Sequence, residues 1–118
     1  MDKTIEKNFK KYILEVDDAL DSYGFKSSSY IDFAENNILE LQDSTKKHFK
    51  EYGHNLLFTN LLETSLNDTI NTIVNHTYEN AKSKNTNYTV EQLQEKTTNL
   101  HENLKFLNTR LLESFNVN

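Results

Sequence analysis

The 118-residue sequence contains no cysteine and no proline, and it has only two glycines. Without cysteine, the chain forms no disulfide, has no thiolate nucleophile and cannot bind zinc through sulfur. Without proline, no position interrupts a helix by removing a backbone donor. Glycine, the other residue that often ends a helix, occurs only at Gly24 and Gly53. These absences favour a few long helices.

Arginine is also scarce, since Arg110 is the only one, and the net charge is -5. Arginine is the preferred residue for bidentate contacts with phosphate and guanine, and an acidic chain is not a general binder of polyanions. No stretch approaches the roughly 20 apolar residues that a membrane span requires. The start of the chain, Met1-Asp2-Lys3, does not resemble a secretory signal. We therefore expect a cytoplasmic protein with no membrane contact.

The apolar residues recur at steps of three and four along four segments, which is the pattern of amphipathic helices. With 36% hydrophobic and 26% charged residues, residues 1–118 are expected to form a single helical domain. Short connections between amphipathic helices place neighbours antiparallel. We predict an all-α, antiparallel up-down four-helix bundle whose third and fourth helices are the longest. The helices are expected at about Lys3 to Tyr23, Ser29 to Tyr52, Asn55 to Lys82, and from Thr89 onward.

Cap signals support these boundaries. Gly24 and Gly53 each follow a tyrosine, and each is predicted to end a helix in the left-handed conformation, with Phe25 making the apolar contact after the first. N-terminal caps are predicted at Asp2, at Ser29 with Asp32, and at Thr89 with Gln92.

The apolar stripes of the third and fourth helices look longer than the first two helices can cover. A homodimer through these two helices is one way to bury the excess.

The segment from Ala19 to Ala34 combines a helix ending in glycine, a serine-rich turn and the start of a second helix. In this it resembles the helix-turn-helix portion of ribbon-helix-helix regulators. That resemblance implies a preceding strand that reads DNA. Here the corresponding residues, Lys10 to Leu14, are predicted to be helical, so the sequence departs from the family where it would contact DNA.

Nothing in the sequence has the pattern of a catalytic site. There is no Ser-His-Asp order, glycine-rich phosphate loop or nucleotide fingerprint. Glu51 and His54 have the Glu-x-x-His spacing of di-iron bundles, but no second copy exists, and a metal needs three or four converging ligands. We interpret Asp17, Asp18 and Asp21 as a solvated face. We therefore predict no enzyme activity, no cofactor and no metal, and we interpret all four histidines as structural or exposed: His48, His54, His76 and His101.

The charges follow a more unusual pattern. Lysines gather in the first half of the first helix and in the last part of the second, and antiparallel packing would bring both groups to one end. By the same argument Asp17, Asp18 and Asp21 would meet Asp32 and Glu35 at the other end. The candidate binding residues are Lys3, Lys7, Lys10, Lys11, Lys46, Lys47 and Lys50.

Two functions fit this arrangement. The first is a non-enzymatic interaction protein, of the adaptor, inhibitor, immunity or chaperone type, that binds another protein through a helical surface. The second is a nucleic-acid-associated regulator that uses the lysines, with Phe9, Tyr12, Phe49 and Tyr52 interleaved among them as at single-strand stacking sites. Those aromatics also fall on the apolar stripe, so we interpret them first as core residues.

Overall fold

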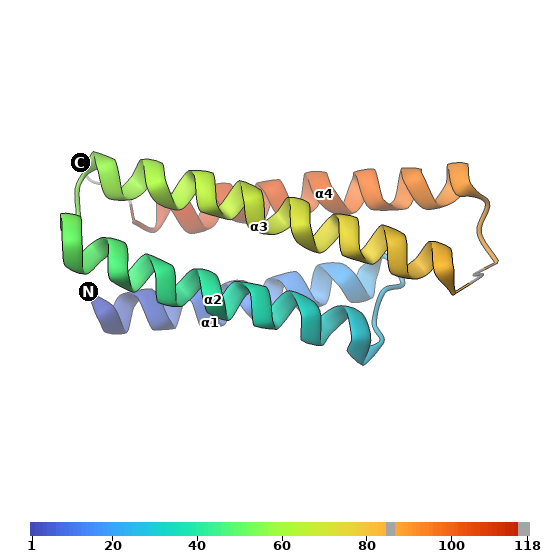
Figure 1. Cartoon of the computed structure of the whole chain (residues 1–118), viewed down its shortest axis with the longest axis horizontal. Coiled ribbons are helices and arrows are strands. Elements are labelled where there is room, and N and C mark those ends of the chain that lie inside the picture. Colours follow the sequence, from blue (N-terminus) through green and yellow to red (C-terminus); the bar gives the residue numbers. More distant parts are fainter. Residues whose placement is uncertain (85–86, 116–118) are drawn as a thin grey trace.

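The computed structural model describes residues 1–84 and 87–115, which form four helices. Each helix packs against two others, α1 against α2 and α4, and α3 against α2 and α4. Successive helices run in opposite directions, so the start of α1 and the end of α4 lie at the same end of the molecule (Figure 1). The bundle measures 48 × 22 × 19 Å. The predicted all-α antiparallel bundle is confirmed, with helices α1 at Asp2–Ser22, α2 at Ser28–Tyr52, α3 at Leu56–Ser83 and α4 at Val90–Glu113.

The helix lengths differ less than expected. The longest helix is α3 with 28 residues, as predicted. However, α4 has 24 residues and is one residue shorter than α2, which has 25. The length difference that suggested a dimer is therefore confined to α3.

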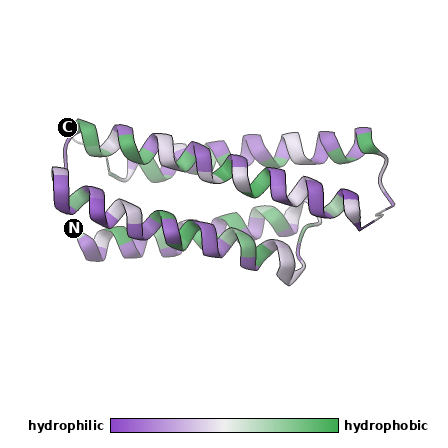
Figure 2. Cartoon of the chain, in the orientation of Figure 1, coloured by the Kyte–Doolittle hydropathy of each residue, from purple (hydrophilic) through white to green (hydrophobic). Residues whose placement is uncertain are grey.

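The core is a single cluster that runs along the bundle axis, and each helix contributes its apolar stripe to it. Hydrophobic residues alternate with polar ones along every ribbon, as expected for helices with one buried face (Figure 2). Near the chain termini the core is aromatic, because Phe58 packs edge-on against Phe49 and Phe115 with ring centroids 6.2 and 6.1 Å apart. Such pairs contribute packing energy beyond the area they bury.

The helix caps explain why the elements stop where they do. Gly24 has a φ of 85°, and the hydrogen bonds from Gly24 N to Asp21 O and from Phe25 N to Leu20 O form the predicted Schellman motif. Phe25 is buried beside it. Thr89 and Gln92 form the predicted capping box.

Two predicted N-terminal caps are wrong. Met1, rather than Asp2, is the N-cap of α1, and Asp2 lies in the first turn, where a negative charge favours the helix dipole. Ser27, rather than Ser29, is the N-cap of α2, and its side chain makes no capping bond. The serine run offers three adjacent candidates for one cap, so its sequence does not fix the boundary.

The region preceding Gly24 is helical throughout, and Lys10 to Leu14 lie inside α1. The strand that a ribbon-helix-helix protein needs is therefore not present there. In the described parts of the chain, no helix is long and apolar enough to cross a membrane.

Candidate interaction surface at the lysine-rich end

Antiparallel packing of α1 on α2 places the first half of α1 beside the last part of α2 (Figure 1). An ion pair between Lys46 of α2 and Glu6 of α1 joins the two segments directly. The structure therefore brings together most of the candidate lysines, while Lys11 lies in a pocket between α1 and α4. We call the other six the lysine-rich end: Lys3, Lys7, Lys10, Lys46, Lys47 and Lys50.

Five lysines of this end are exposed, and Lys46 is half-buried. The hydrogen bond between Lys46 and Glu6 raises the pKa of the lysine and lowers that of the glutamate. Lys46 is thus engaged within the fold. The exposed lysines have their charged groups in water, which is the usual arrangement for a long flexible cation.

Acidic residues lie among these lysines, and the charge prediction did not count them. Besides Glu6, both Asp2 and Asp43 are close enough to Lys46 to raise its pKa. The lysine-rich end is therefore a mixed surface with an excess of positive charge, and it is less basic than the lysines alone would indicate.

The aromatic residues between the lysines belong mainly to the core. Phe9 and Tyr12 are 0% and 2% exposed, and Phe49 is packed against the core. Only Tyr52, at 40% exposure, presents its ring to solvent. Since stacking on nucleic-acid bases needs an exposed ring face, three of the four aromatics proposed for that role cannot take it in this fold.

Exposed apolar residues lie at the same end, around the turn between α2 and α3. Leu56 is 72% exposed and Leu57 is 47% exposed, close in sequence to Tyr52. We did not predict this exposed apolar surface from the sequence, and we call it the apolar tip: Tyr52, Leu56 and Leu57. A signal was available, because Leu56 and Leu57 precede Phe58, where the buried stripe of α3 begins.

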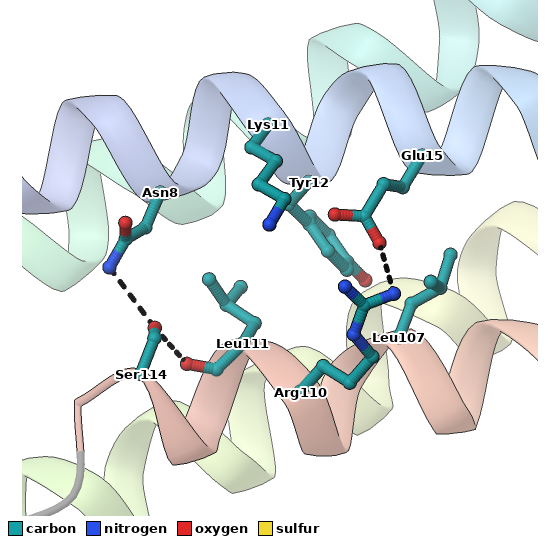
Figure 3. Close-up of a pocket in the computed structure, with 8 residues that line it drawn as sticks. All are labelled: Asn8, Lys11, Tyr12, Glu15, Leu107, Arg110, Leu111 and Ser114. Atoms are coloured by element: carbon teal, nitrogen blue, oxygen red, sulfur yellow. Dashed lines mark hydrogen bonds and ion pairs between the residues drawn. The ribbon is translucent and has the colours of Figure 1, made fainter.

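A separate small pocket lies between α1 and α4 (Figure 3), with a volume of about 100 Å³. Two side-chain bridges cross it. Asn8 Nδ2 donates to Ser114 Oγ over 3.0 Å, and Arg110 Nη1 pairs with Glu15 Oε2 over 3.1 Å. Lys11 lies between these bridges (Figure 3).

A buried polar pair lies beside this pocket. Tyr12 donates its hydroxyl hydrogen to Asn108 Oδ1, and both residues are almost fully buried. Burial raises the pKa of Tyr12, so the phenol keeps its proton. Asn108 Nδ2 is buried and has no hydrogen-bond partner within the described residues. This pair fixes how α1 faces α4, because a shift would leave both polar groups unpaired.

The outer groove between α3 and α4 is polar. It is lined by amides and hydroxyls, including Asn71, Asn75 and Thr98, and His101 Nε2 bridges to Asn71 Oδ1 over 2.8 Å. The long apolar stripes of both helices lie in the core of the single chain. The expected excess apolar face is therefore not found in the groove, and a dimer there stays a prediction that light scattering at about 100 μM can test.

The carboxylates at the opposite end are closer together than their interpretation as a solvated face implied. The pKa of Asp17 is raised to about 7 by partial burial first, then by a hydrogen bond with Glu35 and by the charges of Glu35, Asp18 and Asp32. Within the described ranges, no group of three or more His, Asp or Glu side chains has the arrangement of a metal site. His76 instead stacks on Phe33, with ring centroids 3.7 Å apart, and His54 bonds Phe115 O over 2.6 Å.

Comparison with known protein families, with curated proteins and with solved structures gave no match.

Proposed function

We propose that the chain is a non-enzymatic cytoplasmic interaction protein that binds an acidic surface of a protein partner through its lysine-rich end and apolar tip. The observation that supports this is the combination at one end of five exposed lysines with Leu56 and Leu57, which are 72% and 47% exposed. Protein interfaces typically combine an apolar centre with a polar, solvent-accessible rim. An end that offers both has the composition of such an interface.

The placement of the lysines supports binding over folding stability. Lys50 lies in the last turn of α2, where the helix dipole favours a cation, but Lys3 lies in the first turn of α1, where the dipole disfavours one. Among the lysines of this end, only Lys46 makes an ion pair within the described residues. The remaining charges are free to steer an acidic partner toward this end.

The test is co-purification of the tagged full chain from the cells that produce it, comparing two variants of equal charge. Lys47→Gln with Lys50→Gln removes two exposed lysines from the lysine-rich end. Lys26→Gln with Lys82→Gln removes two exposed lysines from the opposite end, one in the turn between α1 and α2 and one in the last turn of α3. We expect a discrete protein partner with the wild type and the control, and its loss with the first variant. Equal retention by both variants, or no partner with the wild type, would contradict the proposal.

The alternative is a nucleic acid at the same lysines, and the exposed Tyr52 ring is the observation that favours it. The salt dependence of binding distinguishes the two kinds of ligand, because counterion release makes nucleic-acid affinity fall steeply as the salt concentration rises. Fluorescence anisotropy with single- and double-stranded oligonucleotides at about 50 and 200 mM salt measures this. Binding that weakens sharply with salt, and that is lost when Lys46, Lys47 and Lys50 are replaced by Gln, would show that the ligand of these lysines is a nucleic acid rather than a protein.

A further inference from the structure

The pocket between α1 and α4 has a charge pattern that the lysine-rich end does not explain. Its lining includes Lys11 and Arg110, the only arginine of the chain, together with a single acid, Glu15. Two cations against one anion leave this concave surface with a net positive charge. From the geometry we infer that the pocket binds the carboxylate group of a small organic acid.

The cations have donors available for such a ligand. Arg110 pairs with Glu15 through Nη1, and a guanidinium has five N–H donors in a planar fork that matches a carboxylate. Neither of the two ion pairs within residues 1–84 and 87–115 involves Lys11. In Figure 3 the Lys11 ammonium and the Arg110 guanidinium lie on either side of the same space.

The rest of the pocket limits the ligand's size and character. Leu107 and Leu111 line it from α4, so part of the surface is apolar. The bridge between Asn8 and Ser114 closes one side, and the pair of Glu15 with Arg110 closes the other (Figure 3). A volume of about 100 Å³ admits a carboxylate with a short aliphatic tail, whose tail would contact the leucines.

A buried hydrogen bond next to the pocket fixes how α1 packs against α4. Tyr12 lies in the lining and is hydrogen-bonded to buried Asn108, so the two helices meet in one register. The helix positions that carry Lys11 and Arg110 are therefore fixed relative to each other before any ligand arrives. Such preorganisation reduces the ordering cost of binding.

The test is an NMR titration of the ¹⁵N-labelled full chain with acetate, propionate and phosphate, each against chloride at equal ionic strength. We expect saturable shifts at Arg110 Nε and at the backbone amides of Lys11 and Leu111. Propionate should bind roughly fourfold more tightly than acetate, the factor expected for one buried methylene. Phosphate should bind more weakly than propionate, because it has no tail to contact the leucines.

The variants Lys11→Gln and Arg110→Lys should each weaken propionate binding at least tenfold. Arg110→Lys keeps the charge but loses the planar fork. Lys105→Gln, an exposed lysine on the outer side of α4, is the matched control and should bind as the wild type does, and thermal melting verifies that each variant folds. Shifts that do not saturate by about 50 mM, shifts unchanged in Lys11→Gln, or tighter binding of phosphate than of propionate would each overturn the inference.

Discussion

The two ends of the α1–α2 hairpin carry opposite charges, and the spacing of like-charged side chains differs between them. At the lysine-rich end, acids lie among the cations, and Lys46 forms an ion pair with Glu6. At the other end, Asp17 meets Glu35 across the helix interface, and the pKa of Asp17 is raised to about 7. Like charges are thus spread apart at one end and held together at the other.

Side-chain length accounts for the difference. A lysine extends its ammonium into water from almost any position on the helix surface, whereas an aspartate keeps its charge close to the backbone. Antiparallel packing therefore leaves the lysines solvated but partly buries Asp17. In this chain, like charges come into costly proximity at the end that carries the short aspartate side chains. The effect of substitutions on stability is expected to decrease from the aromatic core to the buried polar pair, the acidic end and the lysine-rich end.

The largest effect is expected in the aromatic core beneath the lysine-rich end. Phe58 is fully buried and packs against Phe49 and Phe115. Phe58→Ala should lower the free energy of unfolding by about 3–5 kcal/mol, because a large cavity remains. Urea denaturation followed by circular dichroism measures this, with Phe106→Ala as control. Phe106 is 62% exposed, so its truncation should change stability by less than about 0.5 kcal/mol. Similar losses for both would show that the core does not lie where the structure places it.

A smaller effect is expected midway between the ends, at the buried hydrogen bond of Tyr12 with Asn108. Tyr12→Phe leaves the Asn108 side chain buried without a partner, at a cost of about 1–3 kcal/mol. Adding Asn108→Leu removes the unpaired amide and should recover most of that loss, which a double-mutant cycle measures. No recovery in the double variant would argue against a structural role for the pair.

The free energy of unfolding should depend on pH through the acidic end, where Asp17 lies close to Glu35. The folded-state pKa of Asp17 is about 7, above its ordinary value of 3.8, so the folded chain holds this proton more tightly than the unfolded chain. Its stabilising contribution is complete below about pH 4 and is lost as the pH rises through 7. Asp17→Asn should therefore raise stability at pH 8 by about 1 kcal/mol, less than the full shift implies because the carboxyl is partly solvated.

The same substitution should flatten the dependence of stability on pH between about 4 and 7. Thermal melts across that range, compared with those of Asp21→Asn at the exposed neighbouring carboxylate, provide the control. An unchanged pH profile in Asp17→Asn would show that the pKa of Asp17 is not raised in the folded chain.

The smallest effect is expected at the lysine-rich end itself. Lys47→Gln with Lys50→Gln should change the free energy of unfolding by less than about 0.5 kcal/mol, because both side chains are exposed. A larger change, measured by urea denaturation, would mean that these lysines stabilise the fold and are not simply available to a partner.

The buried helix faces and most of the helix caps could be predicted from the sequence, because they depend on apolar periodicity and on local cap residues. The 3-4 repeat of the fourth helix, predicted from Val90 to Phe115, is buried from Leu93 onward, whereas Val90 is 51% exposed. Gly24 and Thr89 form their predicted caps. Antiparallel pairing also followed from short connections, so the meeting of the lysines with one another and of Asp17 with Glu35 could be anticipated.

Features that depend on how each helix is rotated could not be anticipated. Lys11 differs from Lys10 by one position, yet it lines the α1–α4 pocket. Pairing of Lys46 with Glu6 and of Arg110 with Glu15 joins residues on different helices, where periodicity gives no information. The exposure of Leu57 was missed because its spacing also fits an apolar face.

Site-specific photocrosslinking in the producing cells tests the central proposal most directly, because it compares the two ends in one experiment. A benzophenone amino acid replaces either exposed Lys47 at the lysine-rich end or exposed Asp21 at the acidic end. Our account predicts a discrete protein adduct from position 47 that nuclease leaves intact, and none from position 21. An adduct only at position 21, or one at position 47 that nuclease degrades, would contradict it.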